Sequence, residues 1–319
     1  MGEEVDFFNF HRAAASKLKK RFLKKPNVAE ASSEFEQLKN HLSRIECFPY
    51  AGFTAIARAK CEQGLLNQSG EVDSLIEAAR FFLKADKEID EMNCPNFHEH
   101  LECSMGCFNM SIKIYEENGM SVAAGSVCLE QAEYYKQTHR YDQAIQHYQR
   151  AVEYFSGLPS QAISTMDKVM LCQTLIRDFR SALNTSMDMM KLIKKEGAYH
   201  LDRVTPLGCY NDYYKKCEVT RLLLLLLLQP RPLAINKDYA EVFQQYTWPD
   251  EESMASGSHI LDTLLGEDLF IFLRSLVMAC SGGDIDAIKT VQDGVKDYIS
   301  VEQNVLLQRI VDENCHPKY

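Results

Sequence analysis

The chain lacks the short motifs that mark the common enzyme classes. Its 319 residues contain no phosphate-binding loop ending in Gly-Lys-Ser/Thr, no Gly-X-Gly-X-X-Gly and no Gly-X-Ser-X-Gly. His98-Glu99 is followed by Glu102 where a zinc protease of the His-Glu-X-X-His type has its second histidine. These absences argue against catalysis. We therefore predict no catalytic residues, no cofactor and no enzyme activity.

Helix breakers and strand patterns are also scarce. The chain has only nine prolines and fifteen glycines, its apolar residues recur three and four positions apart, and strand-like alternation is missing. The sequence predicts an all-α protein with helices near residues 5–25, 31–46, 50–66, 72–88, 97–117, 121–138, 141–156, 161–177, 179–195, 210–228, 237–246, 260–281, 284–298 and 301–313. These segments make about seven antiparallel helix pairs.

Long hydrophobic runs are missing as well. The most apolar segment is the seven-leucine run Leu222–Leu228, and a bilayer-spanning helix needs about 20 apolar residues. We therefore expect no membrane insertion. A helix that is apolar on every side is buried, either in the protein's own core, which we favour, or against a partner.

Several features predict a cytosolic protein that does not bind nucleic acid. The N-terminus begins Met1-Gly-Glu-Glu without an apolar signal region, and the eleven cysteines have no framework spacing. We expect free thiols packed as small apolar groups. The net charge of −10 argues against nucleic acid as a partner, because neutralising phosphates needs clustered Lys and Arg.

One group of residues has the side chains of a metal site: Cys94, His98, His100, Cys103 and Cys107. It contains no Cys-X-X-Cys pair, and most of it belongs to one predicted helix. Closed zinc sites normally need a turn between paired ligands. A buried helix face explains the same spacing, so we predict no metal, and a helical enzyme that uses this cluster is the weakest of the alternatives.

The strongest repeat signal begins at Tyr141. Ala144, Tyr148 and Ala151 follow it at +3, +7 and +10, which is typical of the second helix of a tetratricopeptide hairpin. Small residues at these positions let two helices approach closely. The pattern predicts a tetratricopeptide-like right-handed α-solenoid, in which residues 1–319 form a single domain with a mobile loop near 249–258. Such solenoids usually bind other proteins.

Charge is unevenly distributed along the chain. No acid lies between Asp6 and Glu30, whereas no base lies between Lys237 and Arg274. Opposite charges at the two ends suggest two partner surfaces, although a charged run is often only a solvated helix face. The residues that we predict to bind a partner are Lys19, Lys20, Arg21, Lys24, Lys25, Asp250, Glu251 and Glu252. The basic helix fits a helix docked by an apolar stripe at Phe10, Ala14, Leu18 and Phe22, which we favour. It also fits a membrane-surface helix or a nuclear-import signal.

Three groups of sequence strings carry a family resemblance. Ser16–Ala31, with its Lys-Leu-Lys-Lys-Arg-Phe-Leu-Lys-Lys-Pro core, and Cys217–Pro230, with the leucine run, are long and specific. Ser275–Ala279 and Glu302–Leu307 follow in the same order. Together they resemble the 40 kDa huntingtin-associated protein family. The short segment Leu201–Asn211 replaces the long proline-rich insertion of the vertebrate members, and a Gly/Ala-rich N-terminal extension is missing, which suggests an invertebrate member.

The resemblance implies a specific cellular role. It implies a helical scaffold in a constitutive one-to-one complex with huntingtin, held between that partner's helical-repeat domains. It also implies a role on early endosomes as an effector of a Rab GTPase, in a cytoplasmic protein with early-endosome association; the import-like bases allow a nuclear pool. The alternative from another class is a peptide-binding tetratricopeptide adaptor with a different partner.

Overall fold

The computed structural model describes residues 7–19, 26–197, 206–228, 242–243, 245–246 and 264–315. Every regular element within these residues is an α-helix, which confirms the predicted all-α class. The chain divides into two compact units, residues 1–131 and 132–319, and the boundary falls inside helix α6. The single-domain organisation and the right-handed superhelix stay predictions.

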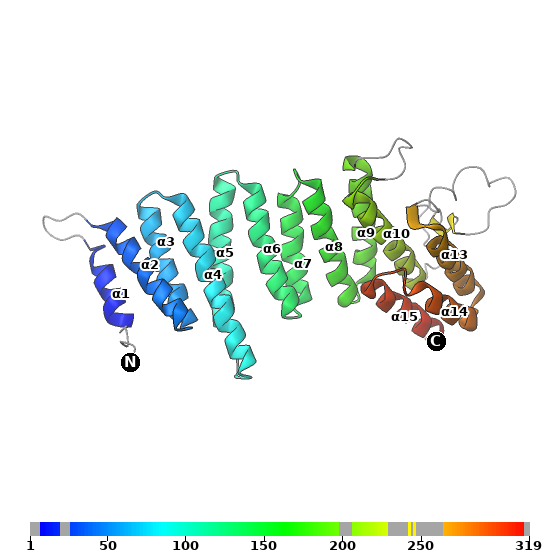
Figure 1. Ribbon diagram of the computed structural model, residues 1–319, viewed down its shortest axis with the longest axis horizontal. Coiled ribbons are helices and arrows are strands. Elements are labelled where there is room, and N and C mark those ends of the chain that lie inside the picture. The colour runs from blue at the N-terminus through cyan, green and yellow to red at the C-terminus, as the bar shows by residue number, and fades with distance from the viewer. Residues whose placement is uncertain are drawn as a thin grey trace. The chain divides into compact units, whose positions relative to one another are not determined.

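The first unit is a series of antiparallel helices, of which the first five pack in chain order (Figure 1). Their bounds are α1 Phe7–Ser16, α2 Val28–Arg44, α3 Phe48–Gly64, α4 Gln68–Glu91, α5 Glu99–Glu117 and the first part of α6 Ser121–Gln137. Packing between sequence neighbours is the arrangement of helical-repeat proteins.

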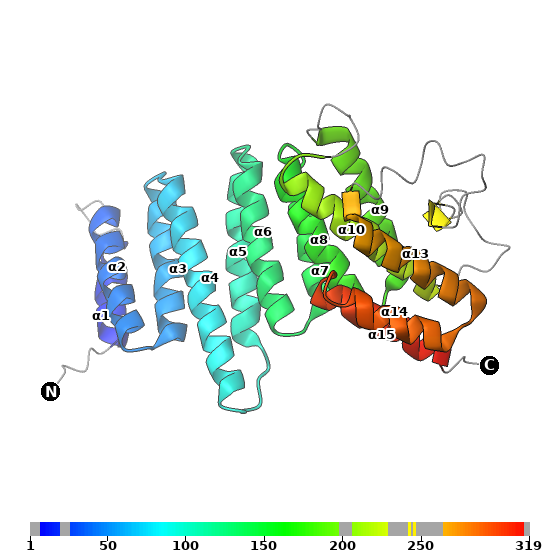
Figure 2. The same ribbon diagram turned by 45° about the vertical axis from the view of Figure 1, so that its right-hand side comes forward.

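The second unit begins in the same way and then folds back on itself. Its helices are α7 Tyr141–Tyr154, α8 Pro159–Leu175, α9 Phe179–Glu196, α10 Cys209–Leu228, α13 Glu267–Gly282, α14 Ile285–Val295 and α15 Val301–Cys315. Helices α7 to α10 pack in chain order, and α15 returns to pack against α10. Figure 2 shows α13, α14 and α15 beside α10. The packing of α15 against α10 therefore departs from the arrangement in which each helix packs on the next one in the chain.

Local sequence explains where several helices begin. Asn27, Asn67, Asp178 and Asp284 each accept a hydrogen bond from the backbone N–H three residues later, the usual N-cap arrangement. Because Asn67 caps α4, that helix starts before the predicted residue 72. At its other end the helix reaches Glu91, beyond the predicted residue 88. Pro49 and Pro159 occupy the first turns of α3 and α8, where no N–H partner is needed.

The tetratricopeptide-like residues occupy the predicted positions. In α7 the fully buried side chains are Ala144, Tyr148 and Ala151, and Ala132 of α6 is also buried. The ring of Tyr135 stacks on His147 with centroids 5.3 Å apart. The spacing therefore identifies the packed face of α7 correctly.

The leucine run lies in the core of the second unit. Leu222–Leu225 are at most 1% exposed, and they pack with side chains of α13 and α15 such as Leu273 and Leu307. The prediction of a buried core helix is confirmed. Beside the run, Glu218 is buried with its carboxylate 2.6 Å from Arg221 Nη2 and accepts a bond from Tyr246 Oη. The buried charge is thus paired and hydrogen-bonded.

Two predicted helix ends are wrong. The first helix ends at Ser16, because Lys17, Leu18 and Lys19 form i→i−3 backbone bonds of a turn in place of further helical bonds. The helix predicted over 260–281 is interrupted at Gly266, between helical residues 264–265 and the start of α13 at Glu267, because Gly266 adopts φ +88°, a conformation outside any helix. The segment 237–246 is described only at 242–243 and 245–246.

The docking face of α1 also differs from the predicted stripe. Phe10 and Leu18 are exposed, and Phe22 lies outside the described residues. Ala14 is buried, as expected, and Phe7 packs its ring 4.5 Å from that of Tyr50. Because the helix has only ten residues, its contact face runs through Phe7 and Ala14, not along an extended i+4 stripe.

Candidate functional site

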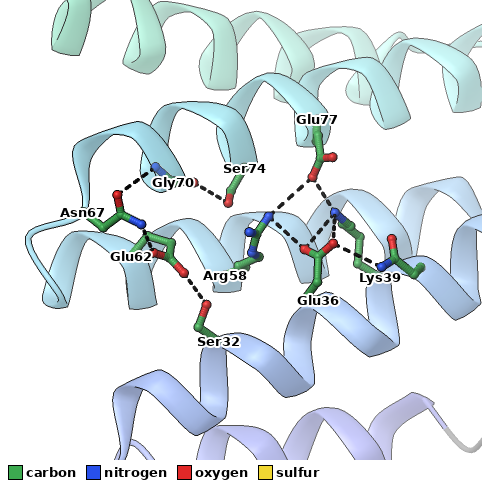
Figure 3. Close-up of polar contacts among 10 residues, drawn as sticks. Ser32, Glu36, Lys39, Arg58, Glu62, Asn67, Gly70, Ser74 and Glu77 are labelled. Atoms are coloured by element: carbon green, nitrogen blue, oxygen red, sulfur yellow. Dashed lines mark hydrogen bonds and ion pairs between the residues drawn. The ribbon is translucent and has the colours of Figure 1, made fainter.

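A network of charged and polar side chains links three helices of the first unit (Figure 3). Lys39 of α2 is almost fully buried, and its ammonium group donates to both Glu36 oxygens at 2.9–3.0 Å and to Glu77 of α4 at 2.5 Å. Arg58 of α3 lies 2.8 Å from Glu36 and 3.7 Å from Glu77. Two cations therefore face two carboxylates across α2, α3 and α4.

A second group of polar contacts fixes the other end of α3. Ser32 donates to the buried Glu62, and Asn67 Nδ2 donates to the other Glu62 oxygen at 2.7 Å. A Cβ at Gly70 would lie 2.5 Å from Asn67 Nδ2, so a larger residue there would displace this amide. These contacts pair side chains of three helices with one another, so the network of Figure 3 acts as a clamp between helices.

The cysteine–histidine group does not converge on one point. Cys94 is exposed in the α4–α5 turn, whereas Cys107 is 1% exposed in α5. Burial raises the pKa of the Cys107 thiol to about 12, so this sulfur stays protonated. His100 stacks on Phe82 with ring centroids 6.1 Å apart. Cys107 and His100 therefore serve the packing of α5, as the spacing of a buried helix face also allowed.

A different group with metal-like ligands is not evident from the sequence. Ligand atoms of Asp86, Asp90 and His98 lie within 4.8 Å of one another, the single such group among the described residues. Asn96 Nδ2 donates to Asp86 Oδ1 at 3.1 Å and to Asp90 Oδ1 at 2.7 Å. This amide nitrogen takes the place that a cation would need. The arrangement therefore locks the α4–α5 turn.

The sequence contains one weak signal for the hydrogen bonds that Asn96 makes in the α4–α5 turn. Asn96 follows Pro95, and an asparagine side chain in a turn commonly bonds nearby backbone groups. Here Asn96 Nδ2 also contacts the Asp86 carbonyl at 3.3 Å, and Asn96 Oδ1 accepts from the His98 N–H at 2.7 Å. No short motif predicts that Asp86, ten residues earlier, supplies the partner.

A small cavity lies between α8, α10 and α15. Its lining includes Asp167, Lys216 and Gln303, and its volume of about 20 Å³ is room for about one water molecule. Lys216 Nζ lies 2.8 Å from Asp167 Oδ2, and Gln303 bonds Thr220 and the Lys216 carbonyl. The cavity is thus too small for a substrate, and its polar side chains join three helices.

Comparison with known proteins places these helices in a family. The family model described as soluble NSF attachment protein, SNAP, matches residues 10–185. The 40-kDa huntingtin-associated protein of Mus musculus is 32% identical over 99% of this chain and 94% of its own length. The protein of the same name from Rattus norvegicus is 31% identical over the same shares. The chain belongs to the family of the 40-kDa huntingtin-associated protein, with a SNAP-type helical region.

Solved structures outside this family show only a weak likeness. BtubC (BKLC) from P. vanneervenii has a TM-score of 0.36 and 12% identity, covering 83% of this chain and 93% of its own. Aspartyl phosphate phosphatase F from Bacillus subtilis has a TM-score of 0.37 and 15% identity, covering 99% and 85%. At these low scores, neither structure bears on the fold or the function of this family member.

The basic residues predicted to bind a partner lie mostly outside the described structure. Lys19 is exposed just beyond the end of α1, and Lys20, Arg21, Lys24 and Lys25 are outside the described residues. Neighbouring Lys17 lies 2.6 Å from Glu30 and also bonds Glu34 of α2, and these hydrogen bonds raise its pKa. At least one base of this segment is therefore already paired within the protein.

The predicted acidic residues and the predicted mobile loop also fall outside the described residues. Asp250, Glu251 and Glu252 all belong to the segment 247–263. The structure therefore does not test either predicted charge group, and both stay predictions for this family member. Among the described helices, none is long and apolar enough to cross a membrane.

Proposed function

We propose that the protein is a non-catalytic scaffold that forms a stable one-to-one complex with huntingtin and bridges its helical-repeat domains. The observation that carries this proposal is the 32% identity over 99% of the chain with a protein named for its association with huntingtin. A match along the whole chain means that both units have counterparts in that relative. We therefore assign the proposed huntingtin complex to the chain as a whole.

The chemistry of the described residues supports a scaffold over an enzyme. The buried ionisable groups, such as Lys39, Glu62, Asp86 and Glu218, bond to other side chains of the protein. Active sites normally hold such groups next to a cavity with room for substrate. The cavity beside Asp167 holds about one water molecule. A surface for macromolecules is the function that remains.

The competing idea of a peptide-binding adaptor finds less support. A peptide-binding adaptor needs charged side chains that are free to meet a short tail in an open groove. In the first unit, Lys39 and Arg58 are instead neutralised by Glu36 and Glu77. These cations are committed to holding helices together.

The cellular part of the proposal follows from the same family. We infer that the complex acts in early-endosome transport in the cytoplasm, as an effector of a Rab GTPase. The basic segment Lys19–Lys25 would contact an acidic surface of huntingtin, and the acids Asp250–Glu252 a basic one. Association through such charged surfaces is fast and salt-sensitive.

Co-purification from native lysate, followed by a binding measurement with purified huntingtin, tests this function. We expect the chain to elute with huntingtin at one-to-one stoichiometry in size-exclusion chromatography with light scattering. Recovery of the chain only as a free monomer, with no binding to the purified partner, would overturn the proposal.

Charge reversal of Lys19, Lys20, Arg21, Lys24 and Lys25 should weaken binding most at low salt. Unchanged affinity would show that these bases are only solvated.

A further inference from the structure

The end of the α4–α5 hairpin projects beyond its neighbouring helices. Helix α4 has 24 residues and its antiparallel neighbour α3 has 17. Lys84 Nζ lies 5.2 Å from the ring centroid of Phe48, the first residue of α3, so the rest of α4 extends past that helix. At a rise of about 1.5 Å per residue this extension is roughly 10 Å long. In both views the α4–α5 turn lies beyond the ends of α2 and α3 (Figures 1 and 2).

The projecting segment, residues 86–102, presents large apolar side chains to solvent; we name it the α4–α5 tip. Phe97 is 83% exposed and Met92 is 65% exposed. Exposed aromatic and methionine side chains are enriched at the centres of protein interfaces. Neither residue packs into the core of the first unit, so folding of the chain does not explain their size or their apolar character.

Acidic residues are concentrated in the same segment as these two side chains. Residues 86–102 contain six acids and one lysine, and that lysine, Lys87, lies 3.4 Å from Glu91. Glu91 and Glu99 are both exposed. The tip therefore combines an apolar centre with a negative rim, and its complement is an apolar pocket with Lys and Arg at its edge.

The tip is held in one conformation before any partner binds. Asn96 bonds Asp86, Asp90 and the His98 N–H, and His98 Nδ1 lies 3.3 Å from the buried Asp86 carboxylate. Asn93 and His98 both adopt positive φ angles, +53° and +58°, which side chains other than glycine rarely do. A rigid turn loses little conformational entropy on binding, so its contacts contribute more of their energy to affinity.

We propose that the α4–α5 tip is a docking element that inserts Phe97 and Met92 into an apolar, Lys/Arg-rimmed pocket of the huntingtin partner. This inference rests on the proposed function, because it assigns a contact within that complex. The charge of the tip selects the partner pocket: an acidic or purely apolar pocket would leave the acids around Phe97 unpaired at the edge of the contact. Asn96 positions Phe97 and does not itself touch the partner.

Affinity measurements with purified huntingtin test the apolar contact. Phe97→Ala and Met92→Ala together should weaken binding at least about tenfold, as expected for a hot spot. Leu66→Ala is the matched control, because Leu66 is 90% exposed in the α3–α4 turn, at the opposite end of α4 from the tip. Its affinity should stay within about twofold of wild type. Equal affinities for both variants would overturn the inference.

Two neutralised pairs test the acidic rim. Glu91→Gln with Glu99→Gln should slow association and reduce its dependence on salt. Glu116→Gln with Glu117→Gln removes two exposed charges at the other end of α5 and should leave both quantities closer to wild type. If the two pairs behave alike, net charge and not the tip controls association, and the proposed rim is wrong.

Alkylation of the wild-type chain gives a readout without mutation. Cys94 and Cys209 are exposed thiols, and Cys94 belongs to the tip. Iodoacetamide should modify Cys94 at least about tenfold more slowly in the huntingtin complex than in the free chain, because burial restricts access to the thiolate. Unchanged Cys94 reactivity in a formed complex overturns the docking inference alone. Failure of the wild-type chain to bind huntingtin overturns the proposed function as well.

Discussion

Phe82 of α4 lies directly against Gly52 of α3. A Cβ at Gly52 would be 2.8 Å from Phe82 Cζ, closer than carbon atoms approach in folded proteins. Phe82 is fully buried, with its ring against Phe53 on one side and His100 on the other. The absence of a side chain at Gly52 thus allows the close approach of α3 to α4, and these contacts link α3, α4 and α5.

Replacement of this glycine should destabilise the first unit. Gly52→Ala forces Phe82 to shift within a packed core, and we expect the free energy of unfolding to fall by about 1–3 kcal/mol. Urea denaturation followed by circular dichroism measures the change. Gly106→Ala in α5 is the control, because a Cβ there would meet no neighbouring helix within 4 Å. At that site the better helix propensity of alanine should stabilise by about 0.5–1 kcal/mol; equal effects at both sites would contradict the packing argument.

The buried lysine of Figure 3 should matter more than an exposed one. Lys39→Met removes the cation that Glu36 and Glu77 share, and Arg58 then faces both carboxylates alone. We expect a loss of about 2 kcal/mol, less than for a fully buried pair because both carboxylates are partly exposed. Lys87→Met breaks the exposed pair with Glu91 and should cost at most about 0.5 kcal/mol. Thermal denaturation compares the two variants; similar losses would show that burial of Lys39 is unimportant.

The N-cap of α9 predicts a defined pH dependence. Hydrogen bonds with Ser181 lower the pKa of Asp178 in the folded protein. The charged cap therefore contributes its full stability above the unfolded pKa of about 3.9, and this contribution is lost as the pH falls through the lower folded value. Asp178→Ala should cost about 1 kcal/mol near neutral pH and less once the pH is below the folded pKa of the carboxyl group.

Asparagine provides the control for this cap. Asp178→Asn keeps an oxygen that accepts from the Ser181 N–H but cannot titrate, so the stability difference between it and Asp178→Ala should not change with pH. Denaturation series at several pH values compare the three proteins. A difference between wild type and Asp178→Ala that is constant down to the lowest pH would contradict the lowered pKa.

Thiol reactivity should separate the cysteines by burial. Cys107 is 1% exposed with its pKa raised to about 12, so at about pH 8 only about one part in ten thousand of it would be thiolate. Exposed Cys94 and Cys209 should react with iodoacetamide in the native protein, whereas Cys107 should react only after denaturation. Peptide mass spectrometry identifies the modified sites. Rapid native labelling of Cys107 would show that α5 opens readily.

Much of the helical architecture can be predicted from local sequence. The spacing of Ala144, Tyr148 and Ala151 predicts a packed face, and all three are buried. The apolar run Leu222–Leu228 predicts a core helix, and its first members are buried as well. Both predictions succeed because the helical period directly determines which residues share a face.

The contacts of the tip and of the charged network cannot be predicted in this way. Lys39 and Glu77 are 38 residues apart, and they meet only because α2 and α4 pack with a particular register. The hydrophobic periodicity predicts only that Asp86 belongs to a helix that ends near residue 88. In the structure, Asp86 anchors the α4–α5 turn by accepting a hydrogen bond from Asn96. Likewise, the extension of α4 beyond α3 depends on the lengths of two helices, and the predicted bounds of α4 are too short to reveal it.

The amino-acid sequence alone is sufficient for the helical class, the buried leucine helix and the family of this protein. Each of these depends on residues within a turn or two of helix, or on strings of identical residues. Tertiary structure decided which charges are paired and which apolar side chains stay exposed. Phe97 and Phe82 are both aromatic residues beside α5, yet one is 83% exposed and the other fully buried. Their difference arises from where α4 passes the end of α3, and that register is set by packing between helices.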